Sequence, residues 1–149
     1  MENMFFKSVF TAMLICLVAC QSSTSEHSDV EKVAEDFAKA YFNYDFEKAA
    51  QLATADSRKW LEYEASNLSH GDIDMLRCQD EGADAVVVGT DYNGGGWATV
   101  RVTARNFLLA DSIGGSGRIV DEHDFELKLR KGDDGQWNVR MEGPLRSGR

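Results

Sequence analysis

The chain has 149 residues, of which 43% are hydrophobic, 10% aromatic and 28% charged. This length and composition indicate one compact domain, and the chain is too apolar and too aromatic to remain disordered. Sixteen basic residues against 25 acidic ones give a formal net charge of −9. Nucleic-acid binding requires a basic patch, and because the sequence contains none, no nucleic-acid partner is expected.

The first 20 residues have the pattern of an export signal. Lys7 precedes an apolar run, residues 9–19, which is too short to span a bilayer core of about 30 Å but suits the apolar part of a signal peptide. The sequence LVAC at 17–20 resembles the lipobox of bacterial lipoproteins. The resemblance implies a signal peptide over residues 1–19 and acyl chains on Cys20, which together would anchor the protein stably. An ordinary secretory signal is the alternative.

A polar segment follows, so residues 20–28 are expected to form the lipidated cysteine and a flexible tether. Gln21 stands at the second mature position, where the sorting rule of enterobacterial lipoproteins places Asp for the inner membrane. By that resemblance we expect the outer membrane of the bacterial cell envelope. Cys16 leaves with the signal peptide, and Cys78, the one remaining thiol, is expected to be half-buried and structural.

Helices are expected first along the mature chain. Ser28, with Glu31 three residues later, forms a capping-box pattern, and apolar residues at spacings of three and four predict a helix over residues 29–43. Asp45 is a suitable cap for a short second helix. A third helix is expected to end at Gly71.

From residue 73 onward the hydrophobic period changes to two, which indicates strands. The expected strands cover residues 73–78, 84–92, 97–109, 118–131 and 136–142. Short glycine-rich turns join them, so the strands are expected to pair antiparallel. Because each strand has one apolar face, the helices must cover the sheet. The predicted fold class is α+β, with N-terminal helices packed in a curved antiparallel sheet of four to five strands.

Two segments resemble small envelope lipoproteins with the nuclear-transport-factor-2-like fold, also called cystatin-like. Residues 33–53 resemble the opening helices of that family, and residues 135–139, GQWNV, resemble its closing strand. The resemblance implies a cone over residues 29–143, in which a bent sheet wraps the long helix and leaves a pocket at the wide end, followed by a tail at 144–149. The family contains enzymes and binding modules, so the fold does not settle the function.

Asp121 and His123 are the weak candidates for catalytic residues. Strand alternation places both on the face that carries Phe125, and enzymes of this fold hold an acid or a histidine inside the cone. Burial would tune such a group into a general acid or base, with Tyr41 and Tyr44 supplying hydroxyls. The alternative is a solvated strand end, and a bulge in the strand would reverse the alternation.

No metal or cofactor is expected. His70, Asp72 and Asp74 alternate and would point one way on a strand, but a loop of solvated polar residues explains them as well. No EF-hand, HExxH or paired CxxC pattern occurs in the sequence.

The expected ligand pocket lies at the wide end of the cone and is lined by four aromatic residues, Tyr41, Trp60, Tyr63 and Phe125. Three functions remain open. The first is a non-catalytic lipoprotein that binds a small apolar ligand or an envelope protein partner. The second is an isomerase or hydrolase-type enzyme that uses Asp121 or His123. The third is an immunity or assembly protein that acts through the sheet face, through which the chain would also form a homodimer.

Overall fold

The computed structural model describes residues 22–110 and 116–146. Its helices are α1 (Ser22–Phe42), α2 (Phe46–Gln51), α3 (Arg58–Asn67) and α4 (His70–Arg77), with a 3-10 turn at Ala55–Ser57. Its strands are β1 (Asp84–Gly94), β2 (Trp97–Leu109), β3 (Arg118–Lys131) and β4 (Trp137–Arg140). The strands form an antiparallel sheet in the order β1-β2-β3-β4, which confirms the predicted α+β class.

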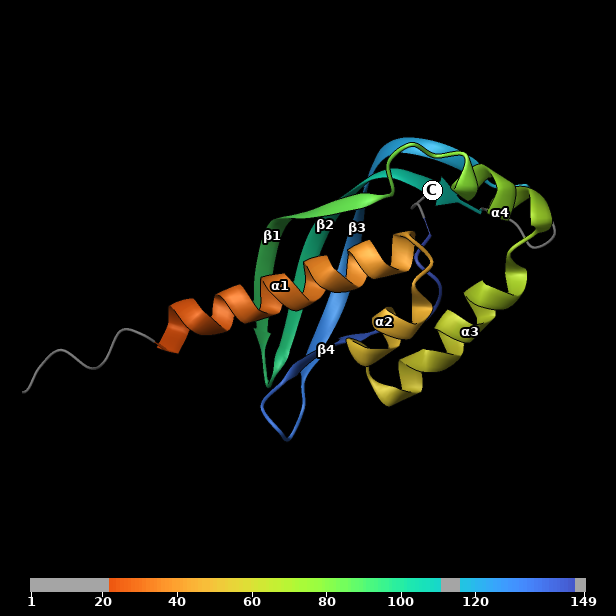
Figure 1. The fold of residues 1–149 in the computed structure, drawn as a ribbon. Helices are drawn as coiled ribbons and strands as arrows, with labels where there is room; N and C mark the ends of the chain where they lie inside the picture. The colour runs from red at the N-terminus through yellow and green to blue at the C-terminus, as the bar shows by residue number, and fades with distance from the viewer. Residues whose placement is uncertain (1–21, 111–115, 147–149) are drawn as a thin grey trace, which may run out of the picture.

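The sheet is bent, and α1 lies across its concave face (Figure 1). α2 packs beside α1 and α3 beside α2, and α4 stands at the far end of the sheet, where it contacts β2. Within the described ranges, no helix combines the length and the apolar character that a membrane crossing requires.

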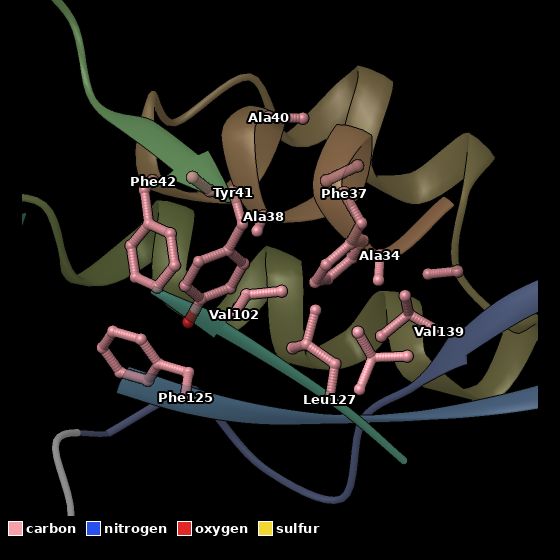
Figure 2. Packing of buried hydrophobic residues seen from close by; sticks show 14 of the residues in the cluster. Ala34, Phe37, Ala38, Ala40, Tyr41, Phe42, Val102, Phe125, Leu127 and Val139 are labelled. Atoms are coloured by element: carbon pink, nitrogen blue, oxygen red, sulfur yellow. The ribbon is translucent and has the colours of Figure 1, made fainter. Parts of the chain in front are cut away.

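The core forms between α1 and the concave face of the sheet. α1 buries a stripe at helical spacing, and Figure 2 shows its residues Ala34, Phe37 and Phe42 projecting toward β2, β3 and β4. The inward-facing residues of the strands, among them Val102 and Leu127, pack against this stripe. The alternation read from the sequence therefore identifies the buried face of both layers.

The convex face of the sheet is charged and internally paired. The Thr103 hydroxyl donates to Asp124 at 2.6 Å, and the Arg105 guanidinium donates to Glu122 at 2.7 Å, across neighbouring strands. Such cross-strand pairs stabilise a solvated face by a few tenths of a kcal/mol to about 1 kcal/mol each. The polar groups of these pairs bind one another across the face, whereas an apolar dimer interface would present exposed hydrophobic side chains.

Two helices differ from the prediction. α1 begins at Ser22, where a flexible tether was expected, so Ser28 lies inside the helix and is not its N-cap. Once the core-facing stripe has nucleated a helix, extension through polar residues costs at most about 0.7 kcal/mol per residue. The predicted strand at residues 73–78 is wrong, because these residues belong to α4. A capping box between Ser69 and Asp72 starts that helix. Gly71 therefore lies within α4 and does not end the third helix, which stops at Asn67.

The strand bounds of β2 and β3 agree with the prediction, and β4 is shorter than expected. After Arg140 the chain leaves the sheet. The backbone N–H of Met141 donates to the Ser57 hydroxyl at 2.8 Å and is therefore not available for a hydrogen bond to the neighbouring strand. The glycine turn at 94–96 joins β1 to β2 as predicted, with positive φ at each glycine. Most of the predicted loop at 112–117 lies outside the described residues.

β2 and β3 change face near their outer ends. Asn106 has a φ of +50°, and the next buried residue after Ala104 is Phe107, so the inward alternation of β2 shifts by one position. Phe107 pairs with Val120, which is half-buried, whereas Asp121 is exposed. The shift matters for the candidate catalytic residues below.

Candidate functional site at the wide end of the cone

The structure separates the two candidate catalytic residues. His123 is half-buried, and its ring meets the Phe125 ring edge-on at 5.0 Å between centroids. Asp121 is exposed, because the change of face at Asn106 removes it from the inner side. Neither side chain lines the cavity at the wide end or the groove at the sheet edge that are described below.

The predicted pocket residues also separate. Tyr41 lines a cavity at the wide end, whereas Phe125 is buried in the core, packed on Phe42 at 4.8 Å between ring centroids. Trp60 and Tyr63 pair edge-on with each other at 6.5 Å on α3, without lining that cavity. Of the four residues that were expected to line a ligand pocket, Tyr41 alone lines this cavity in the described part of the chain.

The alternating residues His70, Asp72 and Asp74 lie neither on a strand nor in the solvated loop that was the other expectation, because all three belong to α4 and Asp72 is buried. Successive helical positions turn by about 100°, so residues two apart diverge. In the ranges that the structure covers, no three His, Cys, Asp or Glu side chains gather as metal ligands. Cys78, which was expected to be half-buried, is exposed just after α4.

The wide end contains a small polar cluster, which we call the cone mouth. It is a cavity of about 10 Å³, room for about one water molecule. Its walls come from α1, the turn after it, α3, the end of β2 and the segment after β4. The lining residues are Tyr41, Phe42, Tyr44, Glu64, Leu108, Leu109, Ala110 and Leu145.

A backbone turn after α1 aims Tyr44 at the mouth. Tyr44 has a φ of +59°, the left-handed conformation that ends many helices. Asn43 holds this turn, because its amide exchanges hydrogen bonds with both the N–H and the carbonyl of Ala83 at 2.9 and 2.7 Å. The Tyr44 hydroxyl then donates to the carbonyl of Leu108 at 3.3 Å.

The two tyrosine hydroxyls remain neutral in this environment. Burial raises the pKa of Tyr41 and of Tyr44 well above the ordinary value, and the nearby charge of Glu64 raises both further. The Tyr41 hydroxyl accepts a hydrogen bond from the backbone N–H of Leu145 at 3.1 Å. Both groups therefore serve as neutral hydrogen-bonding groups.

Glu64 is the buried acid of the mouth, with 9% of its surface exposed. Burial raises the pKa of its carboxyl, and the Arg146 guanidinium opposes that rise only in part. The two groups meet at 3.4 Å between Nη2 and Oε1, and the same guanidinium donates a short hydrogen bond to the carbonyl of Ala110. Glu64 is thus a carboxylate that the fold removes from water and pairs with one cation.

A second buried acid fixes the frame around the mouth. The Asp72 carboxylate accepts bonds from the N–H and hydroxyl of Ser69 at 2.9 and 2.7 Å and from the N–H of Gly117 at 2.7 Å. Burial alone would raise the pKa of Asp72, but these hydrogen bonds outweigh it and hold the pKa below its ordinary value. Asp72 therefore ties α4 to the start of β3.

The larger cavity lies elsewhere, at the sheet edge where the chain leaves β4. It is a groove of about 150 Å³ between residues 126–128 of β3 and residues 139–145. Small-molecule sites typically enclose about 300–1,000 Å³. Both the mouth and this groove are smaller than that.

Sequence reasoning missed Glu64 and Arg146 as site residues. One signal was available for Glu64, since it shares the apolar stripe of α3 with Trp60 and Leu61, and an acid on such a stripe is a candidate for burial. Arg146 follows Pro144 outside any periodic pattern, and its partner lies 82 residues away in sequence. No local pattern identifies such a contact.

Comparison with known proteins supports the fold. No family model and no curated protein matches the chain. A ketosteroid isomerase-like protein from Erwinia carotovora atroseptica is 15% identical with a TM-score of 0.51, over 77% of this chain and 92% of that one. A putative scytalone dehydratase from Novosphingobium aromaticivorans is 16% identical with a TM-score of 0.52, over 85% and 86%. The chain thus has the nuclear-transport-factor-2-like fold, and these likenesses define the fold alone.

Proposed function

We propose that this chain is a lipid-anchored, non-catalytic binding protein of the bacterial envelope, which recognises a polypeptide partner through the cone mouth. The observation that carries the proposal is the packed interior of the cone. The mouth encloses about 10 Å³ and the edge groove about 150 Å³, both below the size of small-molecule sites. Of the two ligands considered, a buried apolar molecule and an envelope protein, this packing favours the protein.

The anchor rests on the LVAC sequence at 17–20. Cys20→Ser removes the acylated thiol, and the expected result is that the protein moves from the membrane fraction to the soluble fraction. Cys78→Ser is the matched control, because that thiol is exposed in the folded domain and lies outside the lipobox. Retention of the Cys20→Ser protein in membranes would contradict the anchor.

The partner surface is tested by site-specific photo-cross-linking in cells. A photoreactive residue at Ala110, which lines the mouth, is compared with one at Asp133, in the exposed β3–β4 turn. The expected result is a protein adduct from position 110 that weakens when Glu64→Gln is added. Adducts of equal yield from both positions, or none from position 110, would remove the mouth as the partner surface.

A second candidate, an acid–base enzyme, is favoured by one observation. Glu64 is a buried acid of raised pKa that shares a cavity with the hydroxyls of Tyr41 and Tyr44. Such an arrangement suits general acid–base catalysis, and the two structural neighbours are described as isomerase-like and dehydratase-like. An NMR titration of the Glu64 carboxyl tests it: a pKa near neutrality supports the enzyme, and a value near the ordinary 4.5 removes it.

A further inference from the structure

We infer that the cone mouth recognises a basic peptide motif, an arginine directly after an apolar residue, and that Leu145 and Arg146 occupy this site as a surrogate from the same chain. The inference deepens the proposed function and rests on it for the existence of a partner. The chemistry of the site, however, is tested separately below.

The segment that carries Leu145 and Arg146 closes one side of the mouth, and it makes three kinds of contact there. The backbone N–H of Leu145 donates to the Tyr41 hydroxyl at 3.1 Å. The Leu145 side chain packs against the buried core. The Arg146 guanidinium donates to the Glu64 carboxylate at 3.4 Å and to the carbonyl of Ala110. Along the chain, the mouth therefore binds a backbone N–H donor and an apolar side chain from one residue and a cation from the next.

The polar groups of the mouth need new partners when the segment leaves. Without the segment, the Tyr41 hydroxyl loses its N–H donor and the Glu64 carboxylate loses its cation, and a ligand that shields both groups from water again must replace these partners, because unpaired buried groups are costly. A ligand that enters must supply an N–H to the first group and a cation to the second. An acidic ligand would be repelled by Glu64 and by the net charge of −9.

Arginine suits the site better than lysine. The two acceptors, Glu64 and the Ala110 carbonyl, are met by different nitrogens of one guanidinium, Nη2 and Nη1. A planar guanidinium presents several donors in fixed directions, whereas an ammonium group is a single point of charge. The geometry therefore selects a forked donor.

The segment that closes the mouth lies outside the regular secondary structure and is partly exposed. Residues 144–146 belong to no helix or strand, and the Arg146 side chain is 38% exposed. Its contact with Glu64, at 3.4 Å, is long beside the 2.7–2.9 Å bonds that Asp72 accepts. Segments with few buried contacts open at low free-energy cost. A partner peptide at sufficient concentration can thus replace it.

The test uses the whole chain with Leu145→Ala and Arg146→Ala, which removes both side chains from the mouth and leaves the backbone of the segment in place; this variant is called the emptied mouth. The probe is acetyl-Gly-Pro-Leu-Arg-amide, the sequence of residues 143–146, and the control probe carries glutamine in place of arginine. NMR or calorimetric titration should show the arginine peptide binding about tenfold or more tightly than the glutamine peptide. The unmodified chain should bind it more weakly, because its own segment competes.

A matched pair of acid substitutions completes the test. Glu64→Gln in the emptied background should abolish the preference for the arginine peptide, whereas Glu62→Gln, an exposed acid on the same helix, should preserve it. Equal binding of the two peptides to a folded, emptied mouth, or no binding of either, would overturn the inference. Folding of each variant is checked by its thermal unfolding.

The two proposals fail in distinguishable ways. A cross-linked partner at position 110 together with no arginine preference leaves the proposed function standing and removes the basic motif. An arginine preference with no cross-linked partner removes the polypeptide partner but leaves the chemistry of the mouth as inferred.

Discussion

The middle of the cone and its mouth lie side by side on α1 but are built from opposite chemistry. In the middle, Phe42, Phe107 and Phe125 pack with ring centroids 4.8–5.5 Å apart and carry no polar atom. In the mouth, the residue that precedes Phe42 on α1, Tyr41, brings a hydroxyl toward the buried acid Glu64. The middle is stable because its apolar rings exclude water, whereas each buried polar group of the mouth needs a hydrogen-bond or charge partner.

The largest effect is expected from a change in the middle. Phe107→Ala leaves a cavity between two aromatic rings and should reduce the free energy of unfolding by about 3–5 kcal/mol. Ile119→Ala, an apolar truncation at an exposed position on β3, should cost less than about 1 kcal/mol. Urea titration measures both, and similar losses would contradict the distinction between core and surface.

An intermediate effect is expected at the frame of the mouth. Asp72→Asn removes a charged acceptor with three hydrogen bonds and should cost about 1.5–3 kcal/mol at pH 7. Because the folded-state pKa of Asp72 lies below 3.8, its stabilisation is present above that pH and is lost as the pH falls through the folded-state pKa.

The control for this change is Asp74→Asn, on the same helix, where the carboxylate is exposed and 3.9 Å from Arg77. It should alter the unfolding free energy by no more than about 0.5 kcal/mol. Unfolding at pH 7 and again near pH 3 should show the difference between the two variants shrinking at the lower pH. A difference that persists at low pH would mean that Asp72 acts through packing alone.

The smallest effect, with the opposite sign, is expected in the mouth. The folded-state pKa of Glu64 is raised, so its ionisation destabilises the fold progressively as the pH rises from about 4.5 through the folded-state pKa. Glu64→Gln should therefore be neutral or stabilising by up to about 1 kcal/mol at pH 7, with Glu62→Gln as the exposed control. A clear loss of stability at pH 7 would show that the carboxylate is a structural anchor.

Most of the sheet was predictable because a period of two and glycine turns are local signals. β3 was assigned residue for residue, since Phe125, Leu127 and Leu129 alternate with charges. The strand predicted at 73–78 failed because the capping residues Ser69 and Asp72 precede the apolar positions and decide the helix. Short apolar runs do not distinguish helix from strand by period alone.

The site was less predictable than the fold. Tyr41 was identified from its place on the stripe of α1, but its polar neighbour Glu64 enters from another helix and the Arg146 contact from beyond β4. Contacts between distant segments depend on where each element ends. The shift at Asn106, which turned Asp121 outward, is likewise a single-residue conformation that composition does not specify.

The early start of α1 has a consequence for how the protein would stand on a membrane. A helix of 21 residues is about 30 Å long, and one residue separates Ser22 from Cys20. With the acyl chains on Cys20 as proposed, the helix α1 would begin two residues after the anchor, where a flexible tether over residues 20–28 had been expected. A shorter tether would keep the mouth nearer the bilayer and would raise its effective concentration toward other anchored proteins.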